Sequence, residues 1–210
     1  TKPLEMIKLA LFASGSGTNV QNIVETFNKP GSVIEATLVI CNNPNAYVLT
    51  RAERLGVESY IIDKNYNLRE PFGPKNSSSL TELLQERHID YIILAGFLLK
   101  IPQQLIDLYP DRIINIHPAL LPKYGGKGMY GHHVHEAVIA AGEKSSGITV
   151  HLVNEHYDSG RILFQASCAI EATDTPDDLA AKIHLLEQAH FPRAIADYIN
   201  SSPQGPASDR

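Results

Sequence analysis

Short apolar runs recur along the chain, and segments with helical periodicity separate them. The first run, IKLALFA (7–13), leads into a glycine-rich turn, after which apolar residues recur at helical spacing: Val20, Ile23, Val24 and Phe27. Strands that are buried on both faces read as nearly continuous apolar runs. The alternation therefore predicts an α/β fold with a mostly parallel, Rossmann-like sheet and helices on both faces. In such sheets, ligands bind beyond the carboxyl ends of the strands.

The same alternation continues through the first half of the chain. Each further run is bounded by glycine, proline or asparagine, which are typical turn residues. We expect strands over 36–41, 58–63, 90–97 and 112–116, and helices over 46–55, around Leu80, Leu83 and Leu84, and over 102–109.

The later part of the chain has a different pattern. A helix near 132–141 precedes two strand-like runs, 146–155 and 161–170, whose short link predicts an antiparallel pair. In the first of these runs Thr149 and His151 alternate with apolar residues, which indicates a strand with two unlike faces. A helix over 175–199 follows, and we expect Pro192 to bend or break it.

Length and composition suit one globular domain. The chain has 210 residues, of which 43% are hydrophobic and 20% are charged. We expect a single domain over 1–200, with two parts at about 6–110 and about 111–200. The end of the chain, 201–210, is rich in serine and proline, and we expect it to be disordered.

Charge and cysteine content narrow the class of protein. A net charge of −5 argues against nucleic acid as a partner, because phosphate backbones require a basic surface. Cys41 and Cys168 lie in strand-like runs without a C-x-x-C spacing, so we expect free thiols and a reducing compartment. No run approaches the roughly 20 apolar residues that span a bilayer. We expect a cytoplasmic protein without a membrane partner, either a monomer or a homodimer.

The turn SGSGTN (14–19) lies where the first strand meets the first helix. Unpaired backbone N–H groups and the helix dipole make such a position suitable for phosphate, and Gly15 and Gly17 permit a tight turn. Val20 occupies the third glycine position of a dinucleotide fingerprint, and no acidic residue ends the second strand, so a nicotinamide cofactor is not indicated. Two interpretations remain open: a phosphate site, or a structural turn in which Asn19 caps the helix.

Asn115 and His117 follow the fifth predicted strand, and Asp158 lies in the link between the two late strands. An asparagine amide can stabilise an oxyanion, and a carboxylate beside a histidine fixes its tautomer and raises its pKa. This trio favours acyl transfer to an external amine. Because no serine or cysteine nucleophile accompanies the trio, we expect direct transfer without an acyl-enzyme.

Several other histidines allow competing interpretations. His132, His133 and His135 lack the i, i+4 pair and the cysteines typical of zinc sites, so we expect no metal there. His151 is either a neighbour of the active site or a packed core residue, and the sequence leaves both interpretations open.

The sequence from Asn115 to Tyr124, NIHPALLPKY, together with YDSG at Asp158 and SGSGTN upstream, resembles the folate-dependent formyltransferases over about residues 6–200. The resemblance implies that 10-formyltetrahydrofolate serves as co-substrate, without a metal. It also implies formyl transfer to the amine of glycinamide ribonucleotide in de novo purine biosynthesis. The alternatives are a formyltetrahydrofolate hydrolase or a formyltransferase that acts on another amine. A tRNA formyltransferase would need a basic C-terminal RNA-binding domain and a hydrolase an additional N-terminal regulatory domain, so we favour the ribonucleotide as the acceptor. The resemblance further implies a phosphate-binding half at about 6–110 and a catalytic, folate-binding part at about 111–200.

The resemblance also implies roles for individual residues. Asn115, His117 and Asp158 would be catalytic, and Leu99 stands where this family often has an arginine. The stretch over 124–135 would be a lid of unusual length. Substrate-binding residues would be Gly17, Thr18 and Asn19 for the phosphate, Glu187 for the ribose, and Arg69, Leu98, Leu99, Lys100, Ile101 and Asn115 for the folate.

Overall fold

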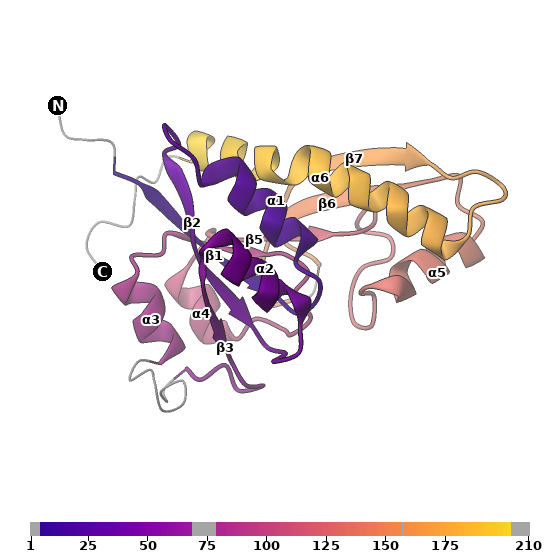
Figure 1. Cartoon of the computed structure of the whole chain (residues 1–210). Coiled ribbons are helices and arrows are strands. Elements are labelled where there is room, and N and C mark those ends of the chain that lie inside the picture. Colours follow the sequence, from indigo (N-terminus) through magenta and orange to yellow (C-terminus); the bar gives the residue numbers. More distant parts are fainter. Residues whose placement is uncertain (1–4, 69–78, 157, 203–210) are drawn as a thin grey trace. The chain divides into compact units, whose positions relative to one another are not determined.

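The chain forms two units, which are described one at a time. The first ends at Ile113, and the second runs from Ile114 to Ser201. The computed structural model in Figure 1 describes residues 5–68, 79–156 and 158–202. Their strands follow the order β3-β2-β1-β4-β5-β6-β7.

The strands of the first unit are all parallel. β1 (Ile7–Ala13) lies between β2 (Ile34–Cys41) and β4 (Tyr91–Leu94), and β3 (Glu58–Ile61) pairs with the outer side of β2. The central strand is the most deeply buried, with zero exposure from Leu9 to Ala13. The predicted parallel sheet is confirmed.

The helices of this unit follow the crossover rule for parallel strands. α1 (Thr18–Phe27) and α2 (Tyr47–Leu55) connect β1 to β2 and β2 to β3, in one direction across the sheet. α3 (Leu80–Glu86) lies in the connection that returns from β3 past β1 to β4. Because such crossovers are right-handed, α1 and α2 cover one face and α3 covers the other. Figure 1 shows α1 and α2 on the near side of these strands. α4 (Gln103–Leu108) follows β4.

The second unit is antiparallel. β5 (Ile113–His117) pairs with β6 (Ser145–Leu152), which pairs with β7 (Ile162–Ala169). The predicted antiparallel pair is confirmed. From Ser146 onward β6 is buried at every position, so both of its faces are covered, the one that carries Thr149 and His151 as well as the apolar one.

Two helices complete the second unit. α5 (His132–Ala140) and α6 (Pro176–Ser201) pack against each other, and α6 also packs on β6 and β7. α6 continues through Pro192, so the expected break does not occur, whereas a bend at this residue stays a prediction. The proline costs one backbone hydrogen bond, but Pro192 lies among buried helix residues such as Phe191 and Ile195, which stabilise the continuous form.

Two further observations concern the cysteine thiols and the apolar character of the helices. Cys41 is a buried free thiol and Cys168 is a half-buried one. Within residues 5–68, 79–156 and 158–202, no helix is long and apolar enough to cross a membrane.

Candidate active site

The register between β5 and β6 sets the first part of the candidate site. Asn115 pairs with His151, and His117 pairs with Thr149 on the neighbouring strand. Directly opposed side chains in an antiparallel pair lie close together. Accordingly, Asn115 Nδ2 lies 3.1 Å from His151 Nε2. His117 and His151 are only 3% and 2% exposed, so both imidazoles lie in a nearly dry environment.

Asp158 reaches the same cluster from the link between β6 and β7. Its backbone is left-handed, with φ of 51°, a conformation that aspartate tolerates better than most residues. Its carboxylate lies 3.5 Å from His117 Nδ1 through Oδ2 and 3.6 Å from His151 Nε2 through Oδ1. The structure thus brings Asn115, His117 and Asp158 together, with His151 as a fourth member.

Backbone groups of the 124–126 loop complete the cluster. The Tyr124 carbonyl lies 2.7 Å from His117 Nε2, and the Gly126 amide donates to Asp158 Oδ2 at 3.0 Å. Because a carbonyl only accepts, Nε2 of His117 carries a hydrogen, and Nδ1 faces the carboxylate. A Cβ atom on Gly125 would lie 2.5 Å from the Leu121 side chain and 3.2 Å from Asp158 Cβ. Glycine is therefore required for this close approach.

His151 fixes the amide of Asn115. Its Nδ1 donates to the Leu152 carbonyl at 2.9 Å, which leaves Nε2 as an acceptor for the Asn115 amide. The structure places His151, which is itself buried, beside the candidate catalytic residues Asn115 and Asp158. One N–H of the Asn115 amide is engaged in this bond, and the amide group is held in one orientation.

Thr149 supports the loop that follows His117. Its hydroxyl donates to the Ala119 carbonyl at 2.7 Å and accepts from the Leu121 amide at 3.0 Å and from the Gln165 side chain at 2.9 Å. Sequence reasoning missed this residue, as well as the backbone groups of Tyr124 and Gly126. The i, i+2 spacing of Thr149 and His151 indicates only that the two side chains share a face.

The glycine turn lies at the start of α1 in the first unit. Gly17 is the N-cap residue, with φ of 78°, and no side-chain hydrogen bond caps the helix. The expectation that Asn19 caps α1 was therefore wrong. A Cβ atom on Gly17 would lie 2.5–2.9 Å from Val48, so both the backbone conformation and the available space require glycine. The Arg51 guanidinium donates to the Ser16 carbonyl at 2.7 Å, which places a positive charge beside the turn.

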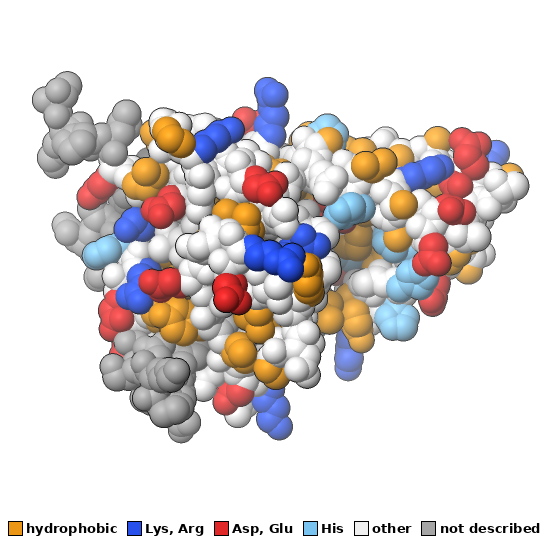
Figure 2. All heavy atoms as spheres, in the orientation of Figure 1, with side chains coloured by type: hydrophobic (Ala, Val, Ile, Leu, Met, Phe, Trp, Pro, Cys, Tyr) orange, Lys and Arg blue, Asp and Glu red, His pale blue; other side chains and the backbone are white. Residues whose placement is uncertain are grey.

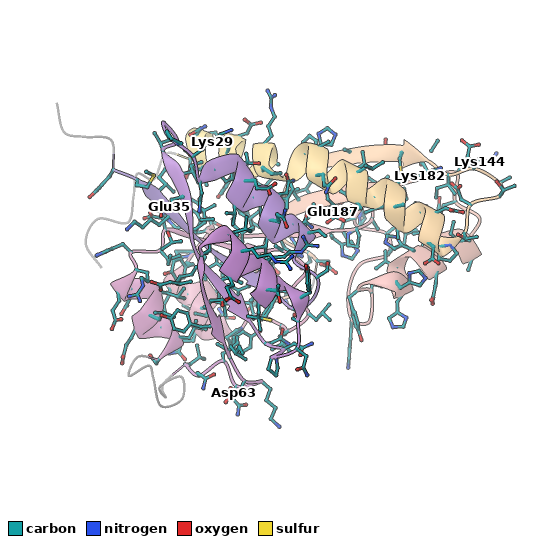
Figure 3. All side chains as sticks on the ribbon, in the orientation of Figure 1. Lys29, Glu35, Asp63, Lys144, Lys182 and Glu187 are labelled. Carbon is teal, nitrogen blue, oxygen red and sulfur yellow. The ribbon has the colours of Figure 1, made fainter. Side chains whose placement is uncertain are left out.

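The predicted folate segment follows β4 in the same unit. Leu98 is 51% exposed and Lys100 is exposed, whereas Ile101 is only 4% exposed. Leu99 is half-buried, and Arg69 lies outside the described residues. In the second unit, Glu187 is a half-buried residue of α6 and is labelled in Figure 3. The binding roles of these residues stay predictions.

The surface histidines of α5 form ion pairs. His132 lies 3.8 Å from Glu136 and 3.5 Å from Asp177, and His133 lies 3.9 Å from Glu136. Figure 2 shows histidine side chains gathered at the surface near this helix. Across the part of the chain that the structure describes, no group of three or more His, Cys, Asp or Glu side chains has an arrangement that could hold a metal ion.

Comparison with known proteins decides the family. The sequence profile of the family described as formyl transferase matches residues 7–195. The chain belongs to the formyl transferase family.

Individual formyl transferases agree with this assignment. The chain is 40% identical over 176 residues to the chloroplastic phosphoribosylglycinamide formyltransferase of Arabidopsis thaliana. The matched region covers 84% of this chain and 60% of the plant protein. It is 34% identical over 201 residues to the phosphoribosylglycinamide formyltransferase of Bacillus subtilis, and this match covers 95% of this chain and 98% of the bacterial protein. The crystal structure of glycinamide ribonucleotide transformylase 1 from Symbiobacterium toebii superposes with a TM-score of 0.81 at 32% identity, covering 96% of this chain and 92% of that chain.

Burial and the neighbouring carboxylate have opposite effects on the pKa of His117 in this formyl transferase. Burial lowers the pKa of the imidazole, and this effect outweighs the opposite effects of Asp158 and the Tyr124 carbonyl. Burial therefore opposes the protonation of His117 that Asp158 favours. Burial alone would raise the pKa of the Asp158 carboxyl, but His151, His117 and the Gly126 amide together lower it.

These pKa shifts predict that the formyl transferase loses stability at mildly acidic pH. Burial also lowers the pKa of His135, which is 7% exposed, and the neighbouring His132 and His117 lower it further. Below about pH 6.5 His117 and His135 become protonated in the unfolded chain. In the folded chain the same two histidines stay neutral until the pH reaches their lower folded-state pKa values. The free energy of unfolding therefore falls as the pH falls through this window. We expect a lower Tm at pH 5.5 than at pH 7.5. Each kcal/mol lost from the free energy of unfolding should lower the Tm by about 2–4 °C.

The His135→Leu variant provides the control for this prediction. It removes one of the two buried imidazoles and leaves the catalytic cluster intact. Its Tm should fall less than the wild-type Tm between pH 7.5 and 5.5. An equal or steeper fall would exclude His135 as a source of the acid sensitivity.

Proposed function

We propose that the protein transfers the formyl group of 10-formyltetrahydrofolate to the amine of glycinamide ribonucleotide, by direct attack. The main support is the contact cluster of Asn115, His117 and Asp158 in a member of the formyl transferase family. The hydroxyl opposite His117 is that of Thr149, and its three hydrogen bonds leave it unsuited to act as a nucleophile. Relatives named phosphoribosylglycinamide formyltransferase support this choice of substrate.

In the proposed mechanism His117 begins as a base. Its neutral Nδ1 accepts the proton that the amine loses as the new C–N bond forms at the formyl carbon. Asp158, 3.5 Å from Nδ1, stabilises the resulting imidazolium. The Asn115 amide, which His151 holds in place, donates to the oxyanion that develops from the formyl oxygen. His117 then returns its proton to N10 of the folate as the C–N10 bond breaks, so the enzyme is regenerated.

The binding residues follow from the same proposal. Backbone N–H groups from Gly17 to Asn19 hold the phosphate, and the Arg51 charge beside Ser16 favours an anion there. Glu187 contacts the ribose, and Arg69 and the segment from Leu98 to Ile101 bind the folate. A cytoplasmic location, a monomeric or homodimeric state and the absence of a nucleic-acid partner remain predictions.

A two-substrate assay tests the proposed function. The protein is incubated with 10-formyltetrahydrofolate in the presence and absence of glycinamide ribonucleotide, and both formylated ribonucleotide and tetrahydrofolate are quantified. Stoichiometric formation of the two products, and only when both substrates are present, is expected. Tetrahydrofolate release without the ribonucleotide would indicate a hydrolase. Turnover only with another amine would indicate a different acceptor, and no turnover in any mixture would indicate a binding protein.

A further inference from the structure

Two hydroxyl groups from distant parts of the first unit form hydrogen bonds with the backbone of the proposed folate segment, Leu98 to Ile101. One belongs to Ser14 at the end of β1, and the other belongs to Tyr66 in the turn after β3. We propose that Ser14 and Tyr66 are positioning residues for the folate subsite, which they shape without contacting the reacting atoms. This inference rests on the proposed function, because it assigns the segment from Leu98 to Ile101 to the folate.

Tyr66 holds one end of the segment. It is 5% exposed, and its hydroxyl donates to the Lys100 carbonyl. Its ring meets Phe97 edge-on at 6.0 Å, and Phe97 meets Phe12 of β1 edge-on at 5.4 Å. Edge-to-face pairs at such distances are favourable. The contacts therefore place the Lys100 carbonyl relative to the core of the sheet.

The backbone of Tyr66 is strained, which indicates that its position matters. Its φ is 64°, and that of Asn67 is 47°, so two consecutive non-glycine residues adopt the left-handed conformation. A bulky residue rarely does so, and strain of this kind tends to occur at functional sites. The turn is held by bonds from the Tyr66 amide to the Asp63 carbonyl and from the Asp63 amide to the Asn67 side chain. Figure 3 labels Asp63 at this turn.

Ser14 holds the other end of the segment. Its buried hydroxyl accepts from the Leu98 amide at 3.0 Å and donates to Asn42 Oδ1 at 2.6 Å. Its own amide donates to the Gly96 carbonyl at 3.0 Å. Ser14 is also the first residue of the SGSGTN turn, which the proposed function assigns to the phosphate. One hydroxyl group therefore joins the two proposed substrate subsites of this unit.

The two anchors should have different kinetic effects. The Tyr66→Phe change removes only the bond to Lys100, so it should disturb folate binding alone. The Ser14→Ala change releases Leu98 and Asn42 together, so it should weaken binding of both substrates. Losing a hydrogen bond to a buried backbone group corresponds to about a 5- to 10-fold change in affinity.

The test measures the Kd of tetrahydrofolate by calorimetry, and the KM of each substrate, for the wild type and the two variants. Tyr66→Phe should raise the folate Kd and the formyl-folate KM about 5- to 10-fold, with an unchanged ribonucleotide KM and a nearly unchanged kcat. Ser14→Ala should raise both KM values. The matched control is Tyr60→Phe on β3, whose hydroxyl bonds to Glu58 at the surface, and its constants should equal those of the wild type.

The outcomes separate this inference from the proposed function. A wild type that does not bind tetrahydrofolate would contradict the proposed function itself. A wild type that binds it, with an unchanged folate Kd in Tyr66→Phe, would overturn the inference alone. A lower Tm in either variant with both KM values intact would show that the hydroxyl groups serve stability only, and would likewise overturn it.

Discussion

The Asp158→Asn variant is expected to lose about 10²-fold or more in kcat, comparable to the loss of one preorganised electrostatic group in other acyl-transfer sites. The carboxylate lies between two buried histidines, and in the proposed mechanism its negative charge stabilises the imidazolium of His117. Asparagine has nearly the same shape and tolerates the left-handed backbone at this position, so the fold should remain intact. The loss should appear in kcat, because the charge is needed chiefly when His117 is protonated.

Single-turnover measurements of formyl transfer test this prediction. The matched control is Asp177→Asn, which removes an exposed carboxylate from the first turn of α6 in the same unit. The control should keep the wild-type rate. A wild-type rate in Asp158→Asn would remove Asp158 from the mechanism.

The Gly17→Ala variant is expected to raise the KM for the ribonucleotide about 10-fold or more. The added Cβ would lie 2.5–2.9 Å from Val48, and the φ of 78° is unfavourable for alanine in any surroundings. Either the SGSGTN turn or α2 must shift, and a shift of the turn would move the backbone N–H groups that are proposed to hold the phosphate. Strain of about 1–3 kcal/mol at a left-handed position corresponds to roughly 5- to 150-fold in a binding constant.

A second substitution relieves part of the collision. Val48→Ala removes the methyl group at 2.5 Å from the added Cβ, so the double variant should recover part of the lost ribonucleotide affinity. The remaining defect would report the backbone strain at Gly17 together with the contacts to the Cβ and Cα atoms of residue 48, at 2.7 and 2.9 Å. An unchanged ribonucleotide KM in Gly17→Ala would mean that the turn has only a structural role.

The elements of the fold were predictable because their causes are local. The apolar run of β1 and the helical spacing from Val20 to Phe27 match the observed strand and helix. Prediction failed where tertiary structure decides. The expected break at Pro192 does not occur, because the residues around this proline are buried.

The candidate site was predictable only in its residue types. Asn115, His117 and Asp158 were chosen for their chemistry, and the structure joins Asn115 to the other two through His151. The position of His151 depends on strand register, which residue types alone do not reveal. The direction in which the pKa of His117 shifts depends on the depth of burial, whose effect outweighs that of the neighbouring carboxylate.

The contacts of the 124–126 loop have a consequence for how substitutions act there. The Tyr124 carbonyl and the Gly126 amide contact His117 and Asp158 through main-chain atoms, so neither contact depends on a side chain. An alanine scan of the loop should therefore preserve the contact made by residue 124. Alanine is unfavourable at Gly125, where a Cβ would collide with Leu121, and at Gly126, whose φ is 93°. Replacement of the Gly126 amide by an ester is the change that would reveal its contribution. The two glycines of this loop thus serve the candidate site through the space and the backbone conformation that they allow.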